Sequence, residues 1–516
     1  MNILPRESGI LLHISSLPGP YGLGDIGPKA FHFVDVLHEM GQSLWQILPL
    51  GDTGSSICPY ITVSTFANNP LLISLDGLID EGYLHKDDLK KIQSYPSDRV
   101  DYQKVYNDRY KILDTACTNF IKSSSVETQQ RFDAFCKENE YWLSEYILFQ
   151  TLKKLNNDQH WITWQPRYDP VGEDIIKENS VFIQKLMIQQ FLFIEQWKKL
   201  KTYANQKGIR FVGDIPIYVA HDSVDVWANP ELFKLDDHGK IKSQSGCPPD
   251  FFNAKGQVWG HPVYNWKTHK KTGYQWWLNR IEHTFNLVDV VRIDHFNGLA
   301  KYWEVKAGGK NGVTGQWVIG PGEDFLSAIN QSLGARPIIA EDLGEAAKEA
   351  AVLRKKFDIP GMFILQFAFG ENAITNGNLN SLDNEINVVY TGTHDNDTTI
   401  GWFQTLPESV ISTQTVADIM KERKRALKFL GTDGSEINWD LISLALQSKA
   451  NTVIIPLQDI LGLGTNARMN TPGTTEGNWQ WRFKKNTLTS DIIERMRTLT
   501  KESKRFKVRY YDGITN

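Results

Sequence analysis

The sequence predicts an α/β fold, a (β/α)8 barrel of the TIM type, from the number and spacing of its apolar runs. Eight short apolar runs are typical of buried parallel strands, and eight is the number that a closed barrel requires. Segments with apolar residues at helical spacing lie between most of these runs. The runs span residues 8–14, 43–50, 209–219, 289–295, 337–343, 362–368, 387–395 and 452–460.

Two gaps between the runs are too long for simple crossovers and predict insertions. Residues 51–208, after the second strand, contain charged, helix-rich segments and indicate a largely helical insertion. Residues 220–285, after the third strand, include a stretch rich in Gly, Pro and Trp and indicate a loop-rich insertion that covers the active site. Long excursions from a barrel usually form lids or substrate-binding subdomains. We expect residues 1–516 to form a single catalytic barrel, with no separate C-terminal β domain.

Composition narrows the classes of function. The chain has 516 residues, 41% of them hydrophobic and 22% charged, and its net charge of −4 gives no electrostatic footprint for nucleic acid or an anionic membrane. The first apolar run is too short for a signal sequence or a membrane span. Four widely spaced cysteines indicate neither a zinc site nor a disulfide framework. We therefore expect a cytoplasmic protein with no nucleic-acid partner, no membrane partner and no metal site.

One glycine motif points to a nucleotide but does not fit well. GLGDIG at residues 22–27 matches the dinucleotide pattern G-x-G-x-x-G. In a true fingerprint the first glycine makes the turn that leaves the strand, whereas here SSLPGPY separates Gly22 from the apolar run. These glycines are better interpreted as permitting a close-packed loop before the next helix.

Three acidic residues stand at or just past the ends of apolar runs: Asp294 in VVRIDH, Glu341 in PIIAEDLG and Asp395 in VVYTGTHD. In parallel α/β folds the active-site residues lie at the carboxyl ends of the strands. These acids are therefore expected on different strands but at the same rim of the barrel. Any one of them alone could equally be a helix N-cap or a salt-bridge partner. All three together favour an active site.

Two carboxyl groups are the minimum that an enzyme needs to break a glycosidic bond. One donates a proton, the other acts as nucleophile or base, and a positively charged transition state lies between them. A third carboxylate can bind sugar hydroxyls or favour the developing charge. Arg292 lies two residues before Asp294 and therefore on the same face of the strand, where it would keep that carboxylate ionised.

The chain resembles the 4-alpha-glucanotransferases of the amylomaltase, or disproportionating-enzyme, type, which are relatives of the α-amylases. The similarity covers nearly the whole chain, and several of the shared strings are long and unusual in composition. They include SGILLHISSLPGPYGLGDIG, FANNPLLISLDGL, GDIPIYVAHDSVDVWANPELF, GCPPDFFNAKGQVWGHPVYNW, VRIDHFNGLAKYW, IIAEDLGE, YTGTHDNDTTIGWF and ARMNTPGTTEGNWQWR.

This resemblance implies a retaining double displacement on α-1,4-glucans, with maltooligosaccharides and glucose as partners and no cofactor. Asp294 would be the nucleophile that forms a covalent glycosyl intermediate. Glu341 would protonate the leaving 4-oxygen and then, as base, activate the incoming 4-hydroxyl. Asp395 would bind hydroxyls of the sugar at the cleavage point and favour its distorted, charged state.

Further binding residues carry over from the same motifs. Asp214 and His394 are similar to the family's sugar-contacting and site-ordering groups, and Tyr60 to its stacking platform beside the cleaved residue. Asp250 and Trp259 lie in the loop that closes over the groove in the family, and Trp259 is expected to stack on the acceptor side.

The sequence departs from the family's pattern in several places, two of them beside Tyr60 and Asp294. Cys58 stands where S-P-Y usually begins, and Asn297 stands where D-H-F-R-G has its arginine, so a cation near the nucleophile is missing. These changes affect donor and acceptor preference, while the three acids are intact. A hydrolase on the same scaffold and a non-catalytic glucan-binding protein remain alternatives. The hydrolase would differ only in that water, rather than a sugar, reacts with the intermediate. The binding protein would not need the three acids in this arrangement.

Overall fold

The computed structural model describes residues 4–92, 94–164, 173–249, 253–370, 379, 382, 384, 387–404 and 415–506. Its centre is a sheet of eight parallel strands, and each strand pairs with its neighbours in register. In spatial order the strands are β10 (Met362–Ile364), β11 (Val388–Tyr390), β12 (Thr452–Pro456), β1 (Glu7–Leu11), β2 (Leu44–Gln46), β3 (Arg210–Ile215), β6 (Val290–Ile293) and β9 (Ile338–Ala340).

The two ends of this sheet meet, so the sheet forms a nearly closed barrel. A parallel bridge joins Ala340 of β9 to Gly361, and the backbone N–H of Ala340 donates to the carbonyl of Pro360 at 2.8 Å. Each of the eight predicted runs contributes one barrel strand, which confirms the predicted (β/α)8 fold. After β12 the described residues form helices and turns, with no further strand as far as residue 506.

The observed strands are shorter than the apolar runs that predicted them. The run at 43–50, for example, pairs as a strand only over Leu44–Gln46. Residues 47–50 nevertheless remain buried. An apolar run thus indicates which residues are buried, and the residues that pair as a strand are only part of that run.

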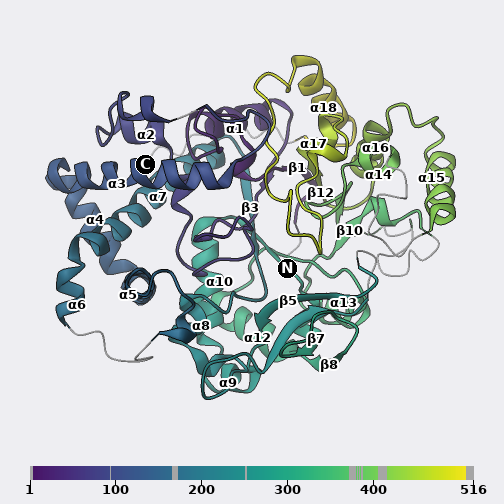
Figure 1. Ribbon diagram of the computed structural model, residues 1–516. Coiled ribbons are helices and arrows are strands. Elements are labelled where there is room, and N and C mark those ends of the chain that lie inside the picture. The colour runs from purple at the N-terminus through teal and green to yellow at the C-terminus, as the bar shows by residue number, and fades with distance from the viewer. Residues whose placement is uncertain are drawn as a thin grey trace.

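Helices surround the barrel and lie between its strands (Figure 1). The shorter ones are α8 (Val224–Ala228), α9 (Trp266–Lys271), α11 (Asn297–Ala300), α14 (Thr399–Gln404) and α17 (Leu457–Ile460). The longer ones are α1 (Pro28–Glu39), α10 (Gln275–Leu287), α12 (Gly322–Leu333), α13 (Ala347–Lys356), α15 (Val416–Leu430), α16 (Ile437–Gln447) and α18 (Ser490–Glu502). Among the described residues, no helix is both long enough and apolar enough to cross a membrane.

A group of helices between β2 and β3 extends to one side of the barrel (Figure 1). Its longest member, α7, is tied to the loop after β2 by two glutamines. The amide of Gln190 accepts from the backbone N–H of Asn68 and donates to its carbonyl, and Gln196 does the same with Ser74. These pairs satisfy buried loop groups that lack a strand partner. The helices are α2 (Leu75–Asp80), α3 (Tyr102–Ser123), α4 (Val126–Glu138), α5 (Glu140–Leu155), α6 (Glu173–Glu178) and α7 (Ser180–Gln206).

A second sheet, which the sequence analysis did not predict, packs at another side of the barrel (Figure 1). It is antiparallel, with the order β5 (Gln257–Pro262), β4 (Ser243–Cys247), β7 (Lys301–Lys306) and β8 (Gly315–Ile319). The segments SQSGC and QVWGHP contain glycine and proline, which are depleted in strands, so their pattern did not indicate pairing. The sheet joins the segment before β6 to the segment after it.

Gly9 of β1 provides a test of how tightly the barrel strands pack. A Cβ atom at this position would lie 2.4 Å from Cβ of Leu44 and 2.5 Å from its carbonyl oxygen, on the neighbouring strand β2. Because both groups are fixed by the barrel, we expect Gly9→Ala to lower the free energy of unfolding by about 1–3 kcal/mol. Guanidinium denaturation would measure this loss. Gly464→Ala is the control, since nothing lies within 4 Å of its Cβ position, and equal stability of the two variants would contradict the prediction.

Candidate active site

The three acids lie at the carboxyl rim of the barrel, where the backbone ladders bring two of them onto neighbouring strands. Asp294 directly follows β6, and its N–H donates to the carbonyl of Ile215 at 2.9 Å. Glu341 directly follows β9, and its N–H donates to the carbonyl of Ile293 at 3.1 Å. Asp395 belongs to the loop after β11. All three line one cleft with a volume of about 980 Å³.

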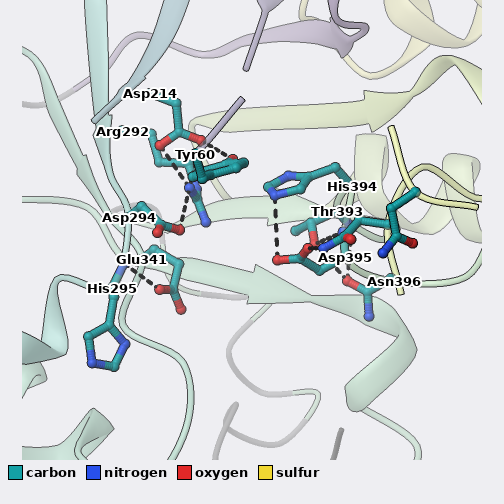
Figure 2. A network of polar contacts seen from close by, with 12 residues as sticks. Tyr60, Asp214, Arg292, Asp294, His295, Glu341, Thr393, His394, Asp395 and Asn396 are labelled. Atoms are coloured by element: carbon teal, nitrogen blue, oxygen red, sulfur yellow. Dashed lines mark hydrogen bonds and ion pairs between the residues drawn. The ribbon is translucent and has the colours of Figure 1, made fainter. Parts of the chain in front are cut away.

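Arg292 holds two carboxylates together below this cleft (Figure 2). Its Nη1 donates to both oxygens of Asp214, at 2.8 and 2.7 Å, and to Oδ1 of Asp294 at 2.9 Å. The contact follows from strand register, since Asp214 of β3 lies opposite Arg292 of β6. The side chain of Asp214 is fully buried, whereas 27% of that of Asp294 is exposed to the cleft. Asp294 is therefore the carboxylate that a substrate can reach.

Burial and the neighbouring charges act in opposite directions on Arg292. Burial alone lowers its pKa, but the carboxylates of Asp214 and Asp294 raise that pKa well above its usual range. The guanidinium is thus a permanent positive charge at the base of the site. Asp294, the acid that a substrate can reach, is therefore in direct contact with a fixed positive charge.

Tyr60 reaches this pair from the loop after β2. Its hydroxyl donates to Oδ2 of Asp214 at 2.7 Å, and its ring stacks on that of His394 with centroids 5.2 Å apart and an interplanar angle of 16°. Trp479 approaches both rings, at 5.7 and 5.9 Å. The three rings form an aromatic wall of the kind that packs against the C–H face of a sugar.

Glu341 has a different environment from Asp294. Burial, partly opposed by Arg292 and reinforced by the charge of Asp294, raises the pKa of Glu341 to about 8. Each carboxyl oxygen accepts one backbone N–H: Oε2 from His295 at 2.7 Å and Oε1 from Leu343 at 3.1 Å. His295 adopts φ of +50°, a conformation uncommon outside glycine, and so aims its N–H at Glu341. Glu341 is therefore a carboxylic acid held protonated near neutral pH.

Asp395 is fixed from the other side of the cleft. Oδ1 of Asp395 accepts from Nδ2 of Asn470 at 2.6 Å, and Oδ2 lies 3.4 Å from Nε2 of His394. The Arg468 guanidinium donates to the backbone carbonyl of Asp395 at 2.6 Å. One third of the Asp395 side chain is exposed, so it can receive substrate hydroxyls.

Trp259, at the middle of β5, is half-buried and lines the same cleft. Its Nε1–H donates to Oε1 of Gln257 at 3.1 Å, and its ring meets that of His295 edge-on at 4.9 Å. Asp250, the other residue expected from this loop, lies outside the described residues. Trp259 is thus adjacent to the loop that holds Glu341.

The structure brings together Tyr60, Asp214, Trp259, Arg292, Asp294, Glu341, His394 and Asp395 from segments far apart in the chain. Sequence reasoning missed Asn470, Trp479 and the backbone donor His295. Asn470 and Trp479 lie in ARMNTPGTTEGNWQWR, whose unusual composition marked the segment but gave no role to either residue. Nothing in the sequence signals a positive φ at a histidine. Within the described part of the chain, no group of three or more His, Cys, Asp or Glu is arranged to hold a metal ion.

Comparison with known proteins agrees with this geometry. A family model described as 4-alpha-glucanotransferase (glycoside hydrolase family 77) matches residues 12–489. The chain belongs to this family. It is 43% identical to the 4-alpha-glucanotransferase of Synechocystis over 93% of this chain and 94% of that protein. It is 39% identical to the 4-alpha-glucanotransferase of Thermus thermophilus over 97% of this chain and 99% of that protein.

A solved structure extends the comparison to the fold. The amylomaltase of Streptococcus agalactiae in complex with acarbose superimposes with a TM-score of 0.90, at 35% identity, covering 97% of this chain and all of that chain. The family's reaction is transfer of glucan segments, and the predicted enzyme class, 4-alpha-glucanotransferase, is confirmed. The reading as a non-catalytic binding protein is correspondingly disfavoured.

The raised pKa of Glu341 gives a pH prediction. An acid that must donate a proton is active below its pKa, so kcat/KM of this glucanotransferase should fall as the pH rises through about 8. Initial rates with maltotriose between pH 5 and 10 would locate this alkaline limb. An alkaline limb near pH 5, where an ordinary glutamic acid ionises, would contradict the environment described for Glu341.

Proposed function

We propose that this 4-alpha-glucanotransferase works through a covalent intermediate on Asp294, with Glu341 as the acid and base. The observation that carries the proposal is the contrast between the two neighbouring carboxyls. Asp294 contacts a permanent cation, whereas burial raises the pKa of the half-buried Glu341 to about 8. A carboxyl beside a fixed positive charge and a neighbouring carboxyl with a raised pKa suit a nucleophile and a proton donor.

In the first step an oxygen of Asp294 bonds to the anomeric carbon of the donor glucan as the bond from that carbon to the glycosidic 4-oxygen breaks. The leaving oxygen takes the proton of Glu341. In the second step Glu341, now a carboxylate, removes the proton from the 4-hydroxyl of an acceptor. That oxygen bonds to the anomeric carbon, and the bond to Asp294 breaks. The two displacements together retain the configuration.

The remaining residues bind and orient the sugar in this proposal. Asp395 and His394 receive hydroxyls of the sugar at the cleavage point, and Tyr60 stacks on its ring. Asp214 keeps Arg292 in place, and Trp259 supports the acceptor. Such fixed groups favour the charged, distorted transition state without reorganising during the reaction.

We further propose that the substrates are α-1,4-glucans and maltooligosaccharides, with glucose or another glucan as acceptor. The relative from Streptococcus agalactiae was solved with acarbose, which supports a saccharide in the equivalent cleft. Residues from both segments between β2 and β6 line the cleft, among them Ile57, Tyr60, Gln257 and Trp259. This supports a role for 51–208 as a helical insertion and for 220–285 as a cover over the site. Four cysteines with no paired spacing suit a reducing compartment, and we propose a cytoplasmic location.

Asp294→Asn and Glu341→Gln test the assignment. Each should lower turnover on maltotriose by at least about 10²-fold, because each removes a group that the first step requires. The reaction is followed by resolving products by chain length. The wild type should give glucose together with oligomers longer than maltotriose.

Binding of maltotriose to both variants, measured by calorimetry, is the control that the cleft remains intact. Near-wild-type turnover in either variant would show that the wrong carboxyl is assigned. Only glucose and maltose from the wild type would favour the hydrolase, in which water takes the intermediate.

A further inference from the structure

The loop after β6 and the loop after β9 are joined by hydrogen bonds that converge on Glu341. The N–H of Phe296 donates to the backbone carbonyl of Glu341 at 2.9 Å, and the N–H of His295 donates to its Oε2. The N–H of Leu343 donates to Oε1. The direction of the carboxyl group therefore depends on where two loop N–H groups are held.

Asn297 completes this arrangement from the first turn of α11. Its side-chain Nδ2 donates to the backbone carbonyl of Leu343, the same residue whose N–H contacts Glu341. Asn297 is only 1% exposed, and its Oδ1 is buried without a hydrogen-bond partner among the described residues. Leu343 is thus held on both sides, by Glu341 through its nitrogen and by Asn297 through its oxygen.

Burying an amide side chain is costly unless its groups are bonded, and here Nδ2 is bonded but Oδ1, within the described part of the chain, is not. A purely structural link between two loops would be cheaper with an apolar side chain of similar size. The single bond that Asn297 makes acts on the residue that orients the carboxyl of Glu341. The hydrogen bond from Asn297 to Leu343 therefore has a role besides packing.

We propose that Asn297 is a positioning residue for proton transfer by Glu341, acting through the backbone of Leu343. The inference rests on the proposed role of Glu341 as the acid. Without Asn297 the carbonyl of Leu343 loses its donor, the 341–343 segment gains freedom, and the Oε1 contact weakens. The carboxyl then spends less time aimed at the glycosidic oxygen, while Asp294, on the neighbouring strand, stays in place.

A pair of donor substrates separates positioning from folding. With maltotriose the leaving 4-oxygen needs the proton of Glu341. With α-maltosyl fluoride Asp294 bonds to the anomeric carbon as the C–F bond breaks, and fluoride leaves with the electron pair and needs no proton. We expect Asn297→Ala and the similarly sized Asn297→Leu to lower kcat/KM on maltotriose about tenfold, a fraction of the 10²–10⁴ that an acid contributes. Their kcat/KM for fluoride release should stay within about twofold of the wild type.

Asn119→Ala is the matched control, because Asn119 also donates to a backbone carbonyl, that of Tyr83, but lies in the helical insertion. In this variant kcat/KM should equal the wild-type value for both maltotriose and α-maltosyl fluoride. A parallel loss on both donors in the Asn297 variants would show a merely structural role, and no loss on either would show that the bond to Leu343 has no effect on Glu341. Both results overturn the proposal. Because the first step is shared by transfer and hydrolysis, the comparison stands even if the wild type hydrolyses maltotriose.

Discussion

The active site depends on one buried cation, Arg292, which binds Asp214 and Asp294 at the same time. Arg292 and Asp214 are nearly inaccessible to water, so neither charge could persist there alone. Removing one partner of such a buried pair typically costs about 3–5 kcal/mol, because the other is left uncompensated. The ion pair therefore fixes the end of β3 against the end of β6. It also holds the positive charge of Arg292 in contact with Asp294.

The same cation explains how neighbouring carboxyls have different chemistry. Asp294 contacts the guanidinium directly, and part of its side chain is exposed in the cleft. Glu341 is one strand further along and half-buried, and burial raises its pKa to about 8 although Arg292 and two backbone N–H donors oppose the rise. The difference arises from position on the barrel. Two adjacent strands end at the same level, and only one of them places its acid in contact with Arg292.

Much of this could be predicted from the sequence because it depends on patterns with a fixed period. Eight apolar runs gave the barrel, and their carboxyl ends located Asp294 and Glu341. The place of Arg292 two residues before Asp294 predicted their contact. The antiparallel sheet escaped prediction because its Gly-containing strand β4 pairs with β7, far along the chain, and the Gly- and Pro-containing strand β5 pairs with β4. These pairings, rather than the propensity of either segment, stabilise the two strands.

The roles of particular side chains depend on longer-range geometry. The motif match pointed to His394 and Tyr60, but the stacking of their rings arises only when the loop after β2 meets the loop after β11. Asn470 binds Asp395 across 75 residues of chain, and His295 contributes its backbone rather than its ring. Neither contact has a local sequence signal. The departure at Asn297 was visible in the sequence, yet its bond to Leu343 was not.

We propose that Asp294, held by Arg292, is the nucleophile. The most direct test of this proposal is to incubate the Glu341→Gln variant with α-maltosyl fluoride and to locate any covalent sugar by mass spectrometry of its peptides. In this variant the intermediate can form, because fluoride needs no proton, but it lacks the base that would transfer the sugar onward. We expect a maltosyl group on the peptide that contains Asp294. Fluoride release with no labelled peptide, or a label on Asp395 instead, would contradict the proposal.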